Sequence, residues 1–374
     1  MDINRVAIFC DFLSLFGGTE YYCAMLAIEL KKRGIDVRVF ILEKPENKYW
    51  INLLDKNNIL HYESQICQCD FIDKVIEKKF ISLIVDNFQN WFPDIIHTSP
   101  AGFLAISFLE DSPNNNIPIV ATEYTTPSAQ SGYWYHKELP KHINKFHAFI
   151  ATCRASAIGI RDYHGYTGYI EEIGHLINKP KLNKENALQN TVGCIARLSP
   201  EKGIEFLLGA WKKVLKYIPD AKLYIYGQGI YEDYYKDLTR ALALSGYIQF
   251  YGTFNPISEF SRIAQKHKIF VQPSLFESIP TSLIELMSCS RAIVATDVGG
   301  IRELINKDTG ILVKSASTDS LANALIKLLS CKTLQKKYAK NSSIIFKARY
   351  SLNKNINDIL NLYKRILTQK NKKI

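Results

Sequence analysis

The chain has 374 residues, of which 47% are hydrophobic and 22% are charged, and its formal net charge is +11. This length is more than one domain usually reaches, so we expect two domains, and the composition excludes a disordered or fibrous protein. No apolar run approaches the roughly 20 residues of a membrane-spanning helix. The amino-terminal sequence MDINRVAIFCDF lacks the pattern of a secretory signal, so we expect a cytoplasmic protein.

The eight cysteines lie mostly inside apolar segments, as expected of buried, reduced thiols in a cytoplasmic protein. Cys67 and Cys69 form a C-x-C pair, but no further ligands follow at the spacing of a zinc site. The sequence therefore predicts no metal site.

Residues 321–374 are strongly basic. They contain 13 Lys and Arg and a single acidic residue, Asp358, so their excess of 12 positive charges is larger than the +11 of the whole chain. Such a region can be a solvated helix face, a nucleic-acid patch, or a surface attracted to anionic lipid headgroups. Nucleic acid is the least favoured partner, because base-stacking aromatics and the motifs of nucleic-acid-binding folds are missing.

Within this basic region, apolar residues recur at helical spacing over residues 351–367. We expect a helix whose apolar face packs on the first domain while its cations point outward. Either these cations hold the protein reversibly at an anionic membrane surface, or they only keep the end of the chain soluble. The cations concerned are Lys364, Arg365, Lys370, Lys372 and Lys373.

Apolar segments alternate with helical segments through the first half of the chain. Residues 5–12 form an uninterrupted apolar run, typical of a parallel strand buried on both faces, and residues 21–33 keep helical spacing up to Gly34. This alternation predicts a doubly wound parallel α/β sheet. Further strands are predicted at 94–98, 117–122 and 148–152, and further helices at 71–84, 102–109 and 154–163.

A doubly wound sheet binds ligands beyond the carboxyl ends of its strands. That rule points to the loop FGGTE, to residues 97–102, and to the loop that begins at Glu123. Gly17 and Gly18 permit a close backbone approach near a helix N-terminus, but the dinucleotide-binding fingerprint G-x-G-x-x-G is absent. Residues 123–140 are rich in Tyr and Trp, and form either a substrate-facing flap or a surface loop packed on its own domain.

The second half follows a polar linker, residues 178–190, with another strand that ends near Ala196. The next loop carries Arg197 and Lys202 and leads into a helix that begins near Gly203. Two cations beside a helix N-terminus suit a diphosphate, although a plain polar connection has the same composition. Further strands are predicted at 222–226, 247–252, 269–272 and 292–296, with a helix at 256–265, so a second doubly wound sheet is expected.

The stretch VQPSLFESIPTSLIEL contains an apolar strand, a loop with Glu277, and a helix that Pro280 opens and that carries Glu285. Unpaired N–H groups in the first turn of such a helix favour an anion such as phosphate. The two carboxylates would then accept hydrogen bonds from hydroxyls of an attached sugar or ribose, which together describe a nucleotide sugar. Taken alone, the same spacing also fits an ordinary capped surface helix.

These motifs together resemble the retaining glycosyltransferases of family 4. The resemblance covers nearly the whole chain and implies the GT-B fold, in which two Rossmann-like domains face each other across a cleft. Residues 1–180, with the return of residues 346–374, would form the acceptor-side domain, and residues 181–345 would bind the nucleotide sugar. The matching motifs, in order, are FGGTE, ARLSPEKG, YIYGQG, YGTF, FESIPTSLIE, VATDVGGIREL and TGILV.

The resemblance also implies roles for individual residues. Arg197 and Lys202 would neutralise the donor diphosphate and its growing charge during reaction. Glu285 would bind the ribose and Glu277 would face the donor sugar, and Glu123 is a further catalytic candidate. The remaining contacts are expected from Gly17, Gly18, Ser278, Ile279, Pro280, Thr281 and Ser282 to the donor, and from Glu20, His97 and Tyr124 to the acceptor.

The chain departs from the family pattern near the reacting centre. Many relatives have a His after the strand that matches IPIVAT, where this chain has Glu123 and Tyr124. His97 ends the preceding strand and is a different position. Between the domains, where relatives often have Asn-Gly or Asn-Pro, this chain offers His175 and Asn178.

The implied reaction moves a hexose from a nucleoside diphosphate, expected to be UDP, to a glycan or lipid-linked saccharide, as in bacterial surface polysaccharide synthesis. It would proceed with retention and without a metal or another cofactor. The expected partners are the nucleotide sugar, the acceptor and an anionic membrane surface, but not nucleic acid. The rival interpretations are a GT-B epimerase or phosphorylase and a non-catalytic protein that binds nucleotide sugars or polyanions.

Overall fold

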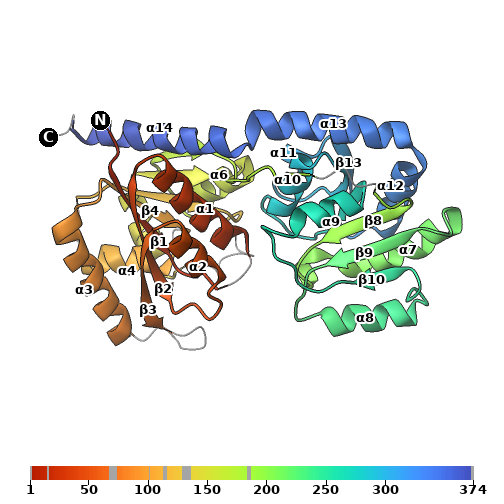
Figure 1. Cartoon of the computed structure of the whole chain (residues 1–374), viewed down its shortest axis with the longest axis horizontal. Coiled ribbons are helices and arrows are strands. Elements are labelled where there is room, and N and C mark those ends of the chain that lie inside the picture. Colours follow the sequence, from red (N-terminus) through yellow and green to blue (C-terminus); the bar gives the residue numbers. More distant parts are fainter. Residues whose placement is uncertain are drawn as a thin grey trace. The chain divides into compact units, whose positions relative to one another are not determined.

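A computed structural model of the chain describes residues 2–14, 17–66, 74–100, 102–112, 116–128, 136–182 and 187–371. The chain forms two compact units (Figure 1). Unit 1 contains Met1–Leu176 and Asn353–Ile374, and unit 2 contains Ile177–Leu352. The boundary expected at residue 180 thus lies close to Leu176, and the chain returns to unit 1 at Asn353, later than the expected residue 346.

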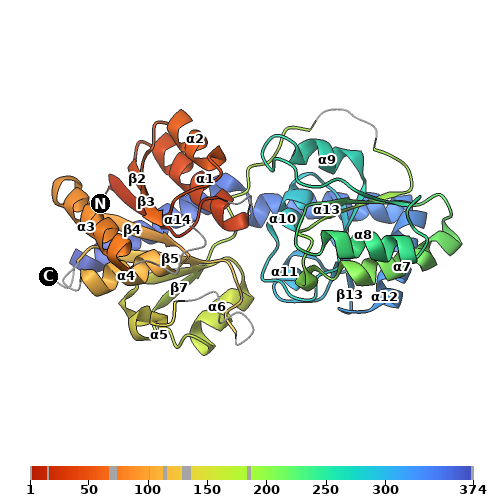
Figure 2. The same cartoon turned by 90° about the horizontal axis from the view of Figure 1, so that it is seen from below.

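Unit 1 is built on a seven-stranded parallel sheet with the strand order β3-β2-β1-β4-β5-β6-β7. Its strands consist largely of buried apolar residues because helices cover both faces of the sheet (Figures 1 and 2). Phe9 of β1 lies at the centre of an aromatic cluster, with ring centroids 5.8 Å from Phe40 and 5.3 Å from Phe108. The strands are β1 Arg5–Cys10, β2 Asp36–Glu43, β3 Leu60–Ile66, β4 Ile95–Ser99, β5 Ile119–Glu123, β6 Ala148–Ala151 and β7 Tyr169–Glu172.

The helices of unit 1 follow the predicted alternation, with additions that the sequence analysis lacks. Strands β3 and β7 and helix α2 were not predicted; β3 is an edge strand whose residues are mostly only partly buried, so it lacks a continuous apolar run. The expected helix at 71–84 begins outside the described residues. The helices are α1 Gly18–Lys32, α2 Tyr49–Lys56, α3 Lys74–Trp91, α4 Phe103–Asp111, α5 Leu139–His142, η2 Ile143–Lys145, α6 Arg154–Asp162 and α14 Leu352–Asn371.

Helix α14 lies along unit 1, and its apolar face packs there as the sequence predicted (Figure 1). Ile356, Ile359, Leu362 and Tyr363 are fully buried, at spacings of three and four residues that bring them onto one face. Asn355 Nδ2 donates to the carbonyl oxygen of His175 at 2.9 Å and fixes the start of the helix on this unit.

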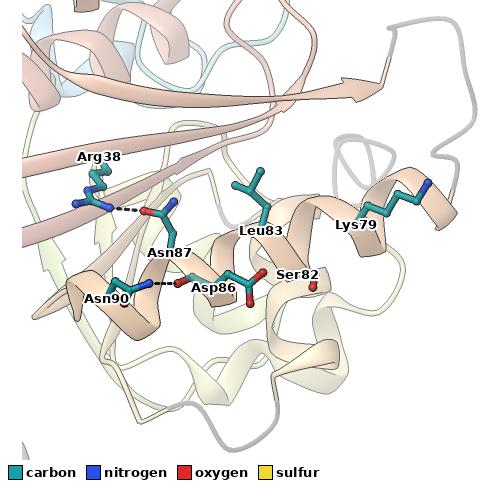
Figure 3. A pocket seen from close by; sticks show the side chains of 7 residues that line it. All are labelled: Arg38, Lys79, Ser82, Leu83, Asp86, Asn87 and Asn90. Atoms are coloured by element: carbon teal, nitrogen blue, oxygen red, sulfur yellow. Dashed lines mark hydrogen bonds between the residues drawn. The ribbon is translucent and has the colours of Figure 1, made fainter.

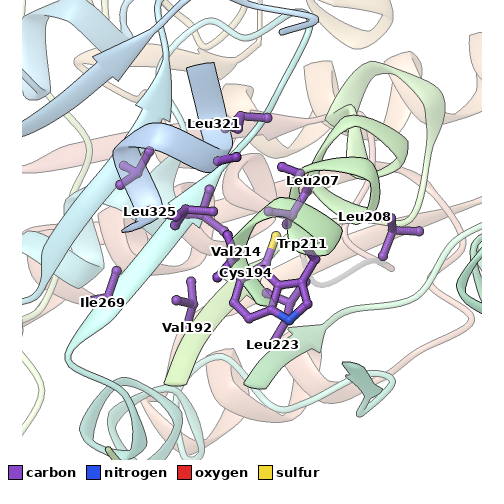
Figure 4. Packing of buried hydrophobic residues seen from close by; sticks show 14 of the residues in the cluster. Val192, Cys194, Leu207, Leu208, Trp211, Val214, Leu223, Ile269, Leu321 and Leu325 are labelled. Carbon is purple, nitrogen blue, oxygen red and sulfur yellow. The ribbon is translucent and has the colours of Figure 1, made fainter. Parts of the chain in front are cut away.

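Unit 2 is built on a six-stranded parallel sheet with the order β10-β9-β8-β11-β12-β13. Trp211 of α7 is fully buried in its core among apolar side chains from the sheet and from α12 (Figure 4). The strands are β8 Thr191–Ile195, β9 Lys222–Tyr226, β10 Ile248–Phe250, β11 Ile269–Gln272, β12 Ala292–Thr296 and β13 Gly310–Val313. The helices are η3 Pro200–Lys202, α7 Ile204–Tyr217, α8 Glu232–Ala241, α9 Phe260–Lys266, α10 Thr281–Ser288, α11 Ile301–Leu304, α12 Thr318–Ser330 and α13 Lys332–Arg349.

The helix expected at 256–265 is shorter than predicted, because α9 begins only at Phe260. The side-chain oxygen of Asn255 accepts hydrogen bonds from the N–H groups of Ile257 and Ser258, which holds the preceding residues in a turn. Across the part of the chain that the structure describes, no helix is both long enough and apolar enough to cross a membrane.

Candidate functional site

Glu277 and Lys202 form an ion pair in unit 2. Lys202 Nζ lies 2.6 Å from Glu277 Oε1, and the side chains are only 14% and 10% exposed. The same carboxylate oxygen accepts from Ser274 Oγ at 3.0 Å and from Gln272 Nε2 at 3.2 Å. Glu277 is therefore held in a fixed position beyond the carboxyl end of β11. The ion pair joins the β8–α7 loop, which carries Lys202, to the β11–α10 loop, which carries Glu277.

Backbone contacts between the two loops hold this ion pair in place. Gly203 adopts the left-handed conformation, with φ of 60°, and a Cβ there would lie 2.4 Å from the carbonyl oxygen of Pro273. The N–H of Leu275 donates to the carbonyl of Glu201 at 2.8 Å. Gly203 is thus required both for its conformation and for the close packing of the β8–α7 loop against the β11–α10 loop.

A third loop, which follows β12, also packs against the residues around Glu277. The N–H of Gly300 donates to the carbonyl of Ser278 at 2.6 Å, and Thr296 Oγ1 donates to the carbonyl of Ser274 at 2.6 Å. Gly299 has φ of 50°, and a Cβ there would lie 1.9 Å from the carbonyl oxygen of Glu277. The three loops thus meet at the carboxyl edge of the sheet, where doubly wound proteins bind ligands.

Arg197 differs from Lys202 in being exposed. Its guanidinium Nη2 lies 3.4 Å from Glu201 Oε1, with 58% of the side chain accessible, so this contact is a weak surface pair. The residue after it is fixed, because the N–H of Leu198 donates to the carbonyl of Gln228 at 2.9 Å. Arg197 therefore extends from a rigid backbone and is free to meet an incoming anion.

The first turn of α10 has the form expected of an anion site. Pro280 is its N-cap residue and Thr281 its first helical residue, so the N–H groups of Thr281 and Ser282 have no acceptors within the helix, whereas the N–H of Leu283 donates to the carbonyl of Pro280 at 3.1 Å. Ile279 and Ser278 are buried, with 4% and 8% of their surface exposed, which anchors the loop. The side chains of Thr281 and Ser282 are partly exposed. This segment can offer backbone donors, while its apolar side chains contribute anchoring rather than contact.

Glu285 lies one turn after Thr281 on the same face of α10. Within the described part of the chain, its carboxyl oxygens have no hydrogen-bond partner, although its side chain is partly buried. Burial raises the pKa of this carboxyl from its ordinary value to about 8. A desolvated carboxyl without a partner is well suited to bind hydroxyl groups of a ligand.

In unit 1, the first predicted loop is organised around Glu20. Gly17 is the N-cap residue of α1, Gly18 is its first residue, and Glu20 is buried in its first turn. A Cβ at Gly17 would lie 2.3 Å from Glu20 Oε2, while φ of −104° at Gly17 is open to any residue. A side chain at residue 17 would therefore require the Glu20 carboxylate to shift.

The expected acceptor contact of His97 is not supported by its position, because the side chain is fully buried. Its Nδ1 lies 2.6 Å from the Tyr363 hydroxyl and its Nε2 lies 2.8 Å from Thr122 Oγ1, so both ring nitrogens are occupied within the protein. Burial lowers the pKa of His97 to about 3, so the ring is neutral. We correct its role to a structural link between β4, β5 and α14.

Glu123 is also turned into unit 1, and Tyr124 is partly buried there. Glu123 is 1% exposed, and its Oε1 accepts from the N–H and the hydroxyl of Thr125 at 2.8 and 2.7 Å. The Tyr124 hydroxyl bonds to Ser99 Oγ, and its ring stacks on His175 with centroids 5.8 Å apart. In this arrangement Glu123 Oε1 and the Tyr124 hydroxyl are both engaged by hydrogen bonds within unit 1. Most of the aromatic part of the loop at 123–140 lies outside the described residues.

A separate surface groove of unit 1 takes no part in this constellation. Its volume is about 620 Å³, and β2 and α3 supply the residues that line it, namely Arg38, Lys79, Ser82, Leu83, Asp86, Asn87 and Asn90 (Figure 3). Its most basic group is already engaged, because Arg38 Nη1 bonds to Asn87 and its guanidinium lies 4.4 Å from the Trp91 ring centroid. None of the predicted site residues lines this groove.

Comparison with known proteins matches two family models to consecutive parts of the chain. Residues 16–177 match Glycosyltransferase Family 4, and residues 175–344 match Glycosyl transferases group 1. The chain belongs to the glycosyltransferase family whose two parts these models describe. The chain spans less than half the length of the first curated relatives it matches, between 43% and 45%.

Individual relatives agree with the family assignment. A GDP-mannose-dependent monoacylated α-(1-6)-phosphatidylinositol monomannoside mannosyltransferase of Corynebacterium glutamicum is 30% identical over 145 residues, which are 37% of each chain. A glycosyltransferase structure from Rickettsia africae superposes with a TM-score of 0.81 at 19% identity, covering 98% of this chain and 99% of that one. The Anabaena protein HepE in complex with UDP gives 0.79 at 17% identity, covering 96% and 100%. These structures show that the fold is GT-B, as the sequence predicted.

Several residues that hold the site in place, and one that caps a helix of unit 1, were not found from the sequence. Gln272 and Ser274 hold Glu277, and both lie in the motif stretch that was examined, yet only the fold shows that they point at the carboxylate. Asp11, directly after β1, accepts from the N–H groups of Phe103 and Leu104 at 2.8 Å and caps α4. Burial raises the Asp11 pKa to about 6. An acidic residue that ends an apolar strand was the available signal.

Proposed function

We propose that the chain is a retaining glycosyltransferase that moves a hexose from a UDP-linked donor to a saccharide or lipid-linked saccharide acceptor without a metal. The observation that carries the proposal is the Lys202–Glu277 ion pair at the carboxyl edge of the unit 2 sheet, next to the first turn of α10. It joins a cation suited to phosphate with a carboxylate suited to a sugar hydroxyl.

The donor diphosphate would bind between the exposed Arg197, Lys202 and the N–H groups at the start of α10. When the bond from the anomeric carbon to the phosphate breaks, negative charge grows on the departing diphosphate. Fixed cations and backbone donors stabilise that charge more strongly in the transition state than in the bound donor, so they accelerate transfer. The same groups allow the departure of the diphosphate without a metal ion.

The two carboxylates would bind the two sugar parts of the donor, the ribose and the hexose. Glu285, which has no hydrogen-bond partner in the described part of the chain, would accept the ribose hydroxyls. Glu277 would accept a hydroxyl of the transferred hexose, because Lys202, Ser274 and Gln272 engage only its Oε1 oxygen in the described structure. Its other oxygen can then face a ligand.

The relatives support this donor and acceptor class without fixing either. The Anabaena structure contains UDP, whereas the Corynebacterium enzyme is named for GDP-mannose and for a lipid-linked mannoside acceptor. We choose UDP on the structural likeness, which covers 96% of this chain. The cytoplasmic location and synthesis of surface polysaccharide remain part of this proposal.

Incubation of the full chain with a panel of UDP- and GDP-linked hexoses tests the proposal. We expect slow release of nucleoside diphosphate from at least one donor, and a transition-state loss of about 2 to 4 kcal/mol in Arg197→Ala and in Lys202→Ala. Lys212→Ala, which alters an exposed lysine of α7, serves as the matched control and should keep full activity. Donor binding without release would indicate a non-catalytic binding protein, and equal activity of all three variants would show that the phosphate site is elsewhere.

A further inference from the structure

The exposed face of α13 is a basic surface to which the proposed function assigns no role. This helix, Lys332–Arg349, contains six Lys and Arg and no Asp or Glu. Its opposite face is fixed to unit 2, where Tyr338, Ser342 and Phe346 are buried. The Ser342 hydroxyl donates to the carbonyl of Thr309 at 3.0 Å. The helix is therefore firmly held, and its outer face has a defined composition.

Three of the six cations of α13 fall on one stripe of that outer face. Lys336, Lys340 and Lys347 are exposed, and the spacings of four and seven residues place them within one side of the helix. Ile344, between Lys340 and Lys347, is 53% exposed on the same stripe. From Lys336 to Lys347 the stripe extends over about 16 Å, at about 1.5 Å per residue. We call these four residues the α13 stripe.

The α13 stripe is not neutralised within the protein. In the described structure no ion pair joins Lys336, Lys340 or Lys347 to a carboxylate, whereas the neighbouring Lys337 lies 3.3 Å from Asp308. An exposed positive surface of this kind attracts a negatively charged partner, and the attraction weakens as salt screens it.

The cations of α14 are a less favourable surface than the sequence suggested. Lys354 pairs with Asp358 at 2.6 Å, and Arg365 pairs with Glu171 at 3.0 Å while lying 5.0 Å from the Tyr169 ring. Lys364 is exposed, but Lys372 and Lys373 lie outside the described residues. The structure thus moves the candidate basic surface from the end of the chain to the α13 stripe.

We propose that the α13 stripe binds the surface of an anionic lipid bilayer. The three lysines of the stripe are spaced along the helix and can each attract a different anionic headgroup, so each contributes independently to binding. The exposed Ile344 can enter the boundary between headgroups and acyl chains, as apolar residues of interfacial helices do. A nucleic acid is disfavoured because the stripe has no aromatic residue for base stacking, its nearest tyrosine, Tyr338, being buried.

Such binding would bring the enzyme to the membrane surface, where a lipid-linked acceptor is present. Bilayer binding needs no donor and no catalysis, so it can fail while the proposed function holds, and the reverse. Its measurement therefore separates the two proposals.

Vesicle flotation of the full chain tests the proposal. We expect binding to vesicles of phosphatidylglycerol and phosphatidylcholine at low salt, loss of binding as salt rises, and no binding to phosphatidylcholine alone. Lys336→Glu with Lys340→Glu should weaken binding by about twentyfold or more, because each lysine is worth about fivefold near such a surface. The matched control is Lys212→Glu with Lys216→Glu, two exposed lysines of α7 at the same spacing, which changes the net charge by the same amount. It should weaken binding much less.

Further variants protect the test against misfolding and against general charge effects. Lys336→Gln with Lys340→Gln should weaken binding about twentyfold without adding repulsion, and Ile344→Ser should weaken the binding measured at low salt. Circular dichroism should match the unaltered chain in each case. No binding to anionic vesicles at low salt would overturn the proposal. Equal losses in the α13 and α7 variants, or binding to polyuridylate that depends on the stripe while vesicles are ignored, would overturn it as well.

Discussion

The Lys202–Glu277 ion pair gives the account a quantitative prediction. We consider Lys202→Met and Glu277→Gln, alone and together, with stability measured as the free energy of unfolding of unit 2. Both side chains are nearly inaccessible, at 14% and 10% exposure, so solvent screens the pair weakly. Removing one partner of a buried pair costs about 3 to 5 kcal/mol, because the other charge remains buried.

Lys202→Met should fall at the low end of that range, at about 3 kcal/mol. Glu277 keeps its hydrogen bonds to Ser274 Oγ at 3.0 Å and to Gln272 Nε2 at 3.2 Å, which partly stabilise the isolated carboxylate. Glu277→Gln should cost about 1 to 2 kcal/mol, because the lysine chain can extend its ammonium group toward water. The double variant should cost less than the sum by about 2 kcal/mol, since the uncompensated charge is then gone.

Urea denaturation followed by hydrogen exchange of peptides from β8 and β11 measures unit 2 separately. Lys202→Ala should also lower kcat/KM of nucleoside diphosphate release. When it is combined with Glu277→Gln, the two effects on kcat/KM should be less than multiplicative, because Lys202 and Glu277 act as a unit. The reasoning is refuted if the stability losses add within about 0.5 kcal/mol, which is the behaviour of independent sites.

The remaining predictions concern four other positions. Because the Glu285 pKa is about 8 and ribose hydroxyls favour the ionised carboxylate, donor affinity should rise from pH 6 to pH 8; calorimetric titration should show this rise in the unaltered chain and not in Glu285→Gln. The His97 pKa is about 3, below its ordinary 6.5, so its contribution to stability is complete above pH 6.5 and is lost as the pH falls toward 3; a His97→Gln chain should show a smaller fall in Tm over this range. Tyr363→Phe leaves His97 Nδ1 without its partner and should lower the free energy of unfolding of unit 1 by about 1 to 2 kcal/mol, and a loss below measurement error would argue against the link. Gly299→Ala should raise the Kd for UDP, since the new Cβ would lie 1.9 Å from the Glu277 carbonyl oxygen and would displace that loop; unchanged affinity would contradict the packing of that loop.

The sequence predicted the elements that follow simple periodicity. Apolar runs such as β1 and β8 are buried on both faces, and their positions set where the loops with Gly17 and Arg197 leave each sheet. The start of α10 was predicted from Pro280, because proline fits the start of a helix and not its interior. The strand-loop-helix order therefore predicted which loops leave the carboxyl edge of the unit 2 sheet.

The contacts within the site were not predictable in this way. Lys202 and Glu277 are 75 residues apart, and no periodicity shows that their loops meet. The sequence predicted that His97 lies near the end of a strand, as a ligand residue would. It lies within β4, and only the packing of α14 shows that its ring faces Tyr363. Side-chain direction at a strand end depends on which helix covers it, and that information lies elsewhere in the chain. The basic surface was likewise expected on α14, because the sequence does not show that Lys354 pairs with Asp358 and Arg365 with Glu171.

The central claim is that unit 2 holds a nucleotide sugar for transfer of its hexose. The most direct test is proton NMR of the full chain with the donor that releases nucleoside diphosphate fastest, supplied with a simple saccharide acceptor. The donor's anomeric signal should be replaced by a product signal of the same anomeric configuration, and Arg197→Ala with Lys202→Ala should abolish the change. A product of inverted configuration, or equal conversion by the double variant, would contradict the central claim.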